Sequence, residues 1–480
     1  MLILDFPKEI QSEFLTFAHR DNSNDEALLL PAEVILSHVC SQWRNIAINL
    51  PILWTTFKFE NFRRASAPID KLEEYLIRSK TQLLELYFDI FASDIQAANQ
   101  RFKLVEIAIA RAWSRCRRFA LFVDSVYAPI GVVDSLKQLD APHLEYFAMC
   151  LASTEDIDDQ DIDDQGDVSP SVLIEGAPNL SVVRIDTTSH FHSLPPLSNV
   201  TTLTIQDSEQ RSYLYSFRAF RSVLMIPTLT NLSIESSMSL NTDSDLFHDP
   251  NALPPIVMPS LRTLRITQDS DILGILWLLD APLLETLVLH DLYLMSLYIG
   301  QDLHGITPFK KLDTFALLDC RCDFTGSAYI GRLDTIDIIL HELAHCATHV
   351  ITSRPTDPSL IESGSNLLNL EKREWPRLQC ITLDLSSTSS SELMSYVKNF
   401  ERSPHSLTLR VVEPVLEHWR EIQLDSLTRL EKVCKLETMK AGELMMDEYW
   451  PAPGGIFHED GNLGVVRWGE SIRARGLPEE

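Results

Sequence analysis

The chain has 480 residues, of which 45% are hydrophobic and 23% charged. This composition excludes a disordered chain, a collagen and a multi-span membrane protein. It carries 68 acidic against 41 basic side chains, which gives a formal net charge of −27. A surface this acidic repels phosphate backbones and anionic lipids, so we expect neither nucleic acid nor a membrane among its partners.

The cysteines and the N-terminus indicate the compartment. Eight cysteines are too few for a disulfide scaffold, and none form a C-x-x-C pair. Only a three-residue apolar run precedes Asp5, which is too short for a signal peptide. No stretch approaches the eighteen uncharged apolar residues of a membrane span. We therefore expect a cytoplasmic or nuclear protein.

Residues 1–57 are predicted to form a short helical domain. A first-turn proline, Pro7, precedes one run of apolar residues at helical spacing, and a second run ends at Pro51. Fewer than sixty residues cannot bury this much apolar surface among themselves. The domain is therefore expected to need a partner or a neighbouring domain. The two runs are Ile10, Phe14 and Phe17, then Val39, Trp43, Ile46 and Leu50.

From residue 140 onward a short phrase recurs, Pro-x-Leu-x-x-hydrophobic-x-hydrophobic. Its last two apolar residues share one face of a short strand, and the proline can stand where the strand begins. Strands joined by returns that bury each other's apolar faces form a solenoid. The copies lie 20 to 45 residues apart, more irregularly than in regular leucine-rich repeats. Their apolar anchors are Leu144, Leu180, Val200, Leu229, Leu261, Leu284, Leu312, Leu333 and Leu378.

The predicted fold class is an α/β repeat, in which a short all-helical domain precedes an irregular leucine-rich-repeat solenoid shaped as a horseshoe. Residues 58–139 are expected to hold linker helices and the first irregular repeats, and 140–411 the repeat array. A C-terminal cap and tail would occupy 412–480, where residues 449–470 combine two tryptophans with clustered glycine and proline. We expect this stretch to be a cap or a docked tail.

Residues 155–167 form an acidic insertion with eight carboxylates among thirteen residues. A calcium loop of the EF-hand type is excluded, because Val172 stands where the twelfth-position glutamate is required. A block of like charges of this kind is typical of a solvated loop.

One motif matches a catalytic pattern, His341-Glu342-Leu343-Ala344-His345. In zinc metalloproteases two histidines four residues apart on a helix bind the metal, and the glutamate acts as general base. A third ligand is missing, because Ile351 replaces the expected histidine and His349 lies about 12 Å along the helix from His341. We therefore interpret the motif as the return after a repeat strand around Leu333. Nucleotide-binding and hydrolase motifs are also absent from the sequence, so we predict no catalytic residue, no metal, no cofactor and no enzymatic activity.

The N-terminal domain resembles an F-box. The resemblance rests on Phe6-Pro7-Lys8-Glu9-Ile10, on Val39-Cys40-Ser41-Gln42-Trp43-Arg44 and on Pro51-Ile52-Leu53-Trp54. Together with degenerate leucine-rich repeats, it is similar to the F-box proteins common in mushroom-forming fungi. Phe6 departs from the usual leucine, and a polar insertion lies near residues 19–26.

The resemblance implies a substrate-receptor subunit of a Skp-cullin-F-box ubiquitin ligase. The F-box would dock a Skp-type adaptor, and through it a cullin, while the repeats hold a target protein that the sequence does not identify. The role would be proximity rather than catalysis. Two alternatives stay open, a repeat scaffold unconnected with ubiquitin and a zinc hydrolase using His341, Glu342 and His345. The adaptor-contact or box-core residues would be Phe6, Pro7, Ile10, Phe14, Val39, Trp43 and Trp54.

Overall fold

A computed structural model represents the protein. The chain divides into two compact units, residues 1–202 with 452–480, and residues 203–451. The structure describes residues 6–22, 31–60, 68–91, 95–124, 130–152, 170–186, 194–206, 214–235, 239–241, 255–267, 276, 278–290, 292, 309–318, 320, 342, 344–353, 375–384, 407–422 and 424–439.

The described residues contain one long parallel sheet of 14 strands in the order β1-β2-β3-β4-β5-β6-β8-β11-β13-β14-β15-β16-β17-β18. Strands follow one another in chain order and alternate with helices or irregular returns, which confirms the predicted α/β repeat class. The first five strands are β1 (Thr56–Glu60), β2 (Leu84–Phe91), β3 (Cys116–Asp124), β4 (Tyr146–Ala152) and β5 (Val182–Asp186).

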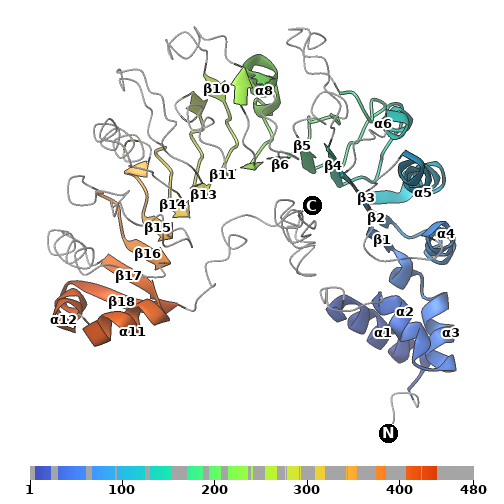
Figure 1. Ribbon diagram of the computed structural model, residues 1–480, viewed down its shortest axis with the longest axis horizontal. Helices are drawn as coiled ribbons and strands as arrows, with labels where there is room; N and C mark the ends of the chain where they lie inside the picture. Colours follow the sequence, from blue (N-terminus) through green and yellow to red (C-terminus); the bar gives the residue numbers. More distant parts are fainter. Residues whose placement is uncertain are drawn as a thin grey trace, which may run out of the picture. The chain divides into compact units, whose positions relative to one another are not determined.

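The first unit opens with three helices and a short 3-10 turn, followed by repeats whose helices cover one face of the sheet (Figure 1). We call this the helix face and the opposite one the second face. The opening elements are α1 (Lys8–Asn22), α2 (Ala32–His38), α3 (Ser41–Asn49) and η2 (Pro51–Trp54). The covering elements are α4 (Pro68–Arg78), α5 (Ile95–Ala112), η3 (Trp113–Arg115) and α6 (Ile130–Leu136).

A row of four phenylalanines runs across the helix face of the first unit. Phe57, Phe88, Phe119 and Phe147 come from β1 to β4 and are each at most 1% exposed. Their ring centroids are separated by 5.9, 6.1 and 6.0 Å in turn. The register pairs Phe119 with Phe147, and it pairs both Phe57 and Phe119 with Leu86, two residues before Phe88 on the same side of β2. The row forms the aromatic centre of this core.

The recurring phrase marks the strands. Of the nine copies, eight lie among the described residues, and each supplies the helix-face residues of a strand in the sheet. The ninth, at Leu333, lies outside the described residues. The predicted place of the proline is wrong, because Pro142 stands in a turn closed by the bond from Leu144 N to Ala141 O (3.2 Å), and β4 begins only at Tyr146. Proline suits the second position of such a turn because its ring fixes φ near −65°.

Neighbouring turns are linked by side chains. Asn179 Nδ2 donates to Pro142 O at 2.6 Å, Asn199 Nδ2 donates to Pro178 O at 2.9 Å, and Ser260 Oγ donates to Pro227 O at 2.6 Å. In each case the residue belongs to one turn and the carbonyl to the turn of the preceding repeat. These bonds hold successive turns in line with the strands that they introduce.

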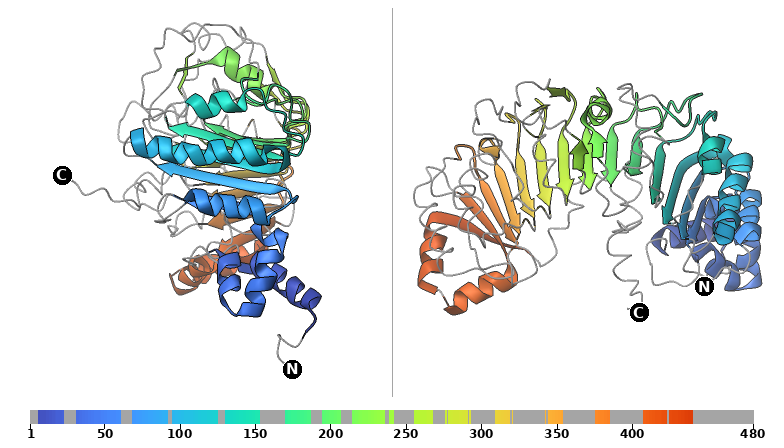
Figure 2. Two further views of the ribbon diagram at one scale, coloured as in Figure 1. Left: turned by 90° about the vertical axis from the view of Figure 1, so that its right-hand side faces the viewer. Right: turned by 45° about the horizontal axis from the view of Figure 1, so that its top comes forward.

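The second unit continues the same pattern of parallel strands (Figure 2). Its strands in the long sheet are β6 (Thr202–Gln206), β8 (Asn231–Glu235), β11 (Thr263–Thr267), β13 (Thr286–His290), β14 (Thr314–Leu318), β15 (His349–Ser353), β16 (Cys380–Asp384), β17 (Leu407–Val412) and β18 (Cys434–Met439). Its helices are α8 (Phe217–Leu224), α11 (Glu413–Ile422) and α12 (Leu424–Val433).

Two small parallel pairs accompany the long sheet in the second unit. They are β7 (Leu214–Ser216) with β9 (Ser239–Asn241), and β10 (Ile256–Val257) with β12 (Leu279–Asp280). The long sheet begins at β1 and ends at β18, so it extends on both sides of the predicted 140–411 array. Residues 155–167 and 449–470 lie outside the described residues.

Candidate functional site

The segment that enters and forms α1 presents a row of large apolar side chains to solvent. Phe6, Ile10, Phe14 and Phe17 recur at spacings of three and four residues, which places them on one side of the helix. They are 39, 51, 43 and 69% exposed, whereas Leu15, on the other side, is fully buried. A contiguous exposed apolar row is typical of a surface that another molecule covers.

Trp43 on α3 lies beside this row. Its ring centroid is 5.8 Å from that of Phe14 at an angle of 54°. The helix begins there because Cys40 caps it, with Sγ accepting from Trp43 N at 3.4 Å. The side chain is half-buried, and its indole Nε1 finds no hydrogen-bond partner in the described part of the chain. Trp43 therefore joins the apolar surface rather than the interior alone.

The seven predicted contact or core residues separate into two groups. Phe6, Pro7, Ile10, Phe14 and Val39 are exposed, with Val39 at 56%, and Trp43 touches Phe14. We call these six residues, together with Phe17, the N-terminal apolar surface.

Trp54 does not belong to that surface. It is only 2% exposed and donates from Nε1 to Ala47 O at 2.8 Å. Its ring contacts Tyr75 edge-on at 5.2 Å and carries the Arg78 guanidinium over its face at 4.3 Å. Of the two alternatives that the sequence left open for Trp54, contact or core, the structure favours the core, because the indole joins α3 to α4 inside the chain.

Phe17 belongs to the apolar run found in the sequence, although it was not named among the contact residues, and its spacing of three from Phe14 continues the α1 row. Sequence reasoning missed three further exposed apolar residues on these helices. Ile35, Ile48 and Ile52 are 36, 36 and 38% exposed. Nothing in the sequence distinguishes them from the buried Ile46, because the difference depends on how the helices pack.

A buried carboxylate fastens the N-terminal helices to the first repeat. Glu33 on α2 is 5% exposed and accepts a short hydrogen bond from the Tyr75 hydroxyl on α4. Its other oxygen lies 3.4 Å from His19 Nε2 on α1. One side chain therefore connects three helices. The apolar surface is held on a rigid base, since α4 itself packs on β1.

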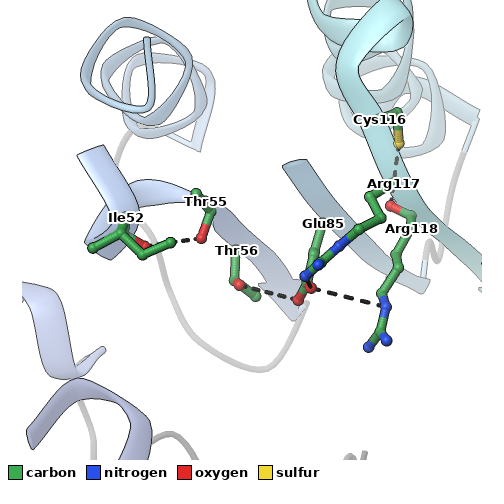
Figure 3. A network of polar contacts seen from close by, with 7 residues as sticks. All are labelled: Ile52, Thr55, Thr56, Glu85, Cys116, Arg117 and Arg118. Carbon is green, nitrogen blue, oxygen red and sulfur yellow. Dashed lines mark hydrogen bonds and ion pairs between the residues drawn. The ribbon is translucent and has the colours of Figure 1, made fainter. Parts of the chain in front are cut away.

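A polar network stands at the start of β1 to β3 (Figure 3). Glu85 accepts from Thr56 Oγ1 at 3.2 Å and pairs closely with Arg117. Arg118 Nε lies 3.8 Å from the same carboxylate. Arg118 is only 2% exposed, so its charge needs this neighbour. The network is structural in kind, because it neutralises buried charge where three strands enter the sheet.

The second face of the first unit carries a buried cluster that the phrase does not predict. It comprises Tyr87, Ala120, Tyr146, Ala148 and Val182, none more than 8% exposed. Burial raises the pKa of the Tyr87 phenol well above its ordinary value, and raises that of Tyr146 in the same way. The two phenols therefore stay neutral at physiological pH.

The metalloprotease-like motif is only partly described. His341 lies outside the described residues, and His345 stands in a turn with Nδ1 3.0 Å from Glu342 O. His349 is on β15, so a helix through residues 341–349 is excluded. Within the described ranges no group of three His, Cys, Asp or Glu side chains could hold a metal ion. No described helix is both long and apolar enough to cross a bilayer.

Comparison with known proteins adds no family. A scan against models of protein families finds no match, and a search of the curated proteins finds no significant match. The functional reading therefore rests on the residues of this chain.

Proposed function

We propose that the protein is a substrate-receptor subunit of a Skp-cullin-F-box ubiquitin ligase. The N-terminal helices would bind the Skp-type adaptor, and the repeats would hold the target. The observation that carries the proposal is the N-terminal apolar surface, which coincides with the motifs that resemble an F-box. The role needs no catalytic group, because holding a target near an enzyme that carries ubiquitin accelerates the transfer of ubiquitin by proximity.

The composition of the surface supports a protein partner. Aromatic and aliphatic side chains dominate it, and interface hot spots are enriched in such anchors, each surrounded by residues that exclude water. The connection from Glu33 to Tyr75 supports it as well, since a receptor must present target and adaptor on one stable body.

The direct test is co-purification of the full chain with a Skp-type adaptor. We expect a stable complex from the wild-type chain and at least tenfold weaker binding for Ile10→Asp and Phe14→Asp, because a buried charge at an anchor is costly. Both residues are exposed, so circular dichroism should show intact folding.

Ile77→Asp is the matched control. Ile77 is 62% exposed on α4, outside the N-terminal apolar surface, so the same chemical change there should leave adaptor binding intact. If the folded wild-type chain binds no such adaptor, the receptor proposal is wrong.

A further inference from the structure

We propose that the turns ahead of β14 and β16 form a basic site, made of Lys310, Lys311 and Arg377, that binds an acidic segment of another protein. The inference goes beyond the proposed adaptor role, because the basic site belongs to the second unit and the N-terminal apolar surface to the first. Only the identity of the bound protein, which in a receptor would be the target, rests on the proposed function.

The basic site lies on the tips of β-turns at the edge where the strands enter the sheet. Residues 309–312, 344–347 and 375–378 form turns that are each closed by a hydrogen bond from the fourth residue to the first, at 3.0, 2.8 and 3.2 Å. These turns introduce β14, β15 and β16, which are neighbours in the sheet. The two central residues of such a turn form its tip. The first turn therefore presents the two lysines of the basic site, and the third presents its arginine.

A hydrogen bond holds the arginine beside the lysines. Arg377 Nη1 donates to Lys310 O at 3.1 Å, across 67 residues of sequence. The backbones of the two turns are two strand spacings apart, about 10 Å, so the arginine side chain reaches back over the middle turn. That middle turn has His345 and Cys346 at its tip, and neither is acidic. The guanidinium thus joins the lysine turn, and three cationic side chains gather there.

These cations have no carboxylate partner in the described part of the chain. All three residues are exposed, and the bond to Lys310 O is the one described interaction of their side chains. Asp313 follows closely in sequence, but its carboxylate accepts a hydrogen bond from the Thr348 hydroxyl. By contrast Arg262, which follows an earlier turn, pairs with Glu285. In a chain with a formal net charge of −27, cations gathered without a carboxylate indicate a site for an anionic partner.

The earlier turns show that the alignment of the strands does not need these lysines. Six described turns of the same kind precede β4, β5, β6, β8, β11 and β13, and none has a lysine or arginine at its tip. The turns that align with their neighbours through side chains do so with asparagine or serine. The second central residues of the six turns are His143, Asn179, Asn199, Thr228, Ser260 and Leu283.

An acidic peptide segment suits the basic site better than a long polyanion. A guanidinium binds a carboxylate through parallel hydrogen bonds, and ammonium groups add point charges. Trp375, half-buried at the start of the arginine turn, adds an aromatic side chain, and interface hot spots are enriched in Trp and Arg. Nucleic acids and anionic membranes extend beyond the site and would be repelled by the rest of the acidic chain. A short segment meets the local cations alone, because charges more than about 8 Å away are screened at physiological ionic strength.

The test is the fluorescence anisotropy of a labelled hexaglutamate peptide titrated with the full-length protein at about 0.15 M salt. We expect saturable binding, at least tenfold tighter than that of hexaglutamine. The double variant Lys310→Glu with Lys311→Glu should weaken hexaglutamate binding at least tenfold, and so should Arg377→Glu. Arg377→Lys keeps the charge, so it should weaken binding less than Arg377→Glu.

Lys103→Glu with Lys432→Glu is the matched control. Both lysines are exposed, one on α5 and one on α12, so this double variant changes the net charge by the same amount as the lysine variant of the basic site. It should leave hexaglutamate binding within about twofold of wild type, because distant charges are screened. Circular dichroism should show intact folding of every variant, since all the replaced side chains are exposed.

Three results would overturn the proposal. The first is that the wild-type protein binds hexaglutamate no more tightly than hexaglutamine. The second is that the control variant weakens binding as much as the lysine variant of the basic site, which would show an effect of net charge alone. The third is complete displacement of the peptide by inorganic phosphate at the same ionic strength, which would identify a site for a small anion. None of these measurements involves the adaptor, so they can fail without affecting the receptor proposal.

Discussion

The phenol of Tyr75 on α4 donates a hydrogen bond to the buried carboxylate of Glu33 on α2, across 42 residues of sequence. Tyr75 also contacts Trp54 and Phe57 edge-on, at 5.2 and 5.5 Å. One residue thus joins the N-terminal helices, the 3-10 turn and the first strand. The small helical domain therefore gains much of its stability from the repeats behind it.

Removing that phenol should loosen this junction. Tyr75→Phe keeps the ring contacts but leaves the buried Glu33 carboxylate with one donor fewer, and we expect a loss of about 1–3 kcal/mol in the free energy of unfolding. Urea denaturation followed by tryptophan fluorescence measures the effect. Glu74→Gln serves as the control, since Glu74 is exposed and pairs only across one helical turn with Arg78. Equal midpoints for Tyr75→Phe and wild type would contradict this account.

The phenylalanine row should be the least tolerant part of the core. Phe119 is fully buried between Phe88 and Phe147, so Phe119→Ala removes contacts with two repeats at once. We expect a loss of about 3–5 kcal/mol, the usual range for such a truncation. Thermal denaturation checks it against Phe6→Ala, an exposed substitution that should cost at most about 0.5 kcal/mol. Similar melting temperatures for the two variants would show that the row is not cooperative.

Cys434 makes the stability depend on alkaline pH. Burial raises the pKa of its thiol to about 11, above the ordinary value of an unfolded cysteine. Below this ordinary pKa the Cys434 thiol is protonated in both the folded and the unfolded chain, so its full contribution to the free energy of unfolding is present. As pH rises from about 9 toward about 11, the unfolded chain loses its proton first and stability falls. The urea midpoints at pH 8 and pH 10 should therefore differ less for Cys434→Ala than for the wild-type protein. If the difference is the same in both proteins, the Cys434 thiol is not the source of the alkaline loss of stability.

His349 makes the free energy of unfolding depend on acidic pH, so that stability is lost as the pH falls rather than as it rises. Burial lowers the pKa of its imidazole, Arg410 lowers it further, and Asp313 opposes them. The ring is held near Thr382, with Nε2 2.7 Å from Oγ1. As pH falls below the ordinary value of about 6.5, the unfolded chain takes the proton first and stability declines.

His349→Gln keeps a hydrogen-bonding side chain but does not titrate. Between pH 7 and 5 its denaturation midpoint should fall less than that of the wild-type protein. If the midpoint of the variant falls more steeply than that of the wild-type protein, His349 is not the source of the acid loss of stability.

Much of the fold could be predicted because the repeated phrase constrains the helix-face residues of each strand. It predicted strands such as β4 and β11, but it missed β15, whose sequence around His349 was interpreted as helix-compatible. The second-face cluster was also missed. Tyr87, Tyr146 and Val182 are brought together by strand register, and their positions in the sequence follow no period of their own.

The N-terminal surface was predicted in part for a similar reason. Helical spacing identifies the exposed row from Ile10 to Phe17, because periodicity reports which residues share a side. It does not report which side faces the rest of the molecule. The sequence therefore left Trp54 as either a contact or a core residue, and its indole is enclosed between α3 and α4.

The bonds from Asn179, Asn199 and Ser260 to the preceding turns have an evolutionary consequence. They align β5, β6 and β11 with their neighbours at the entry side of the sheet, across returns of different length. Insertions and deletions in those returns leave this alignment unchanged. At these three turns we therefore expect a change in the length of the preceding return to be tolerated better than the loss of the side-chain donor.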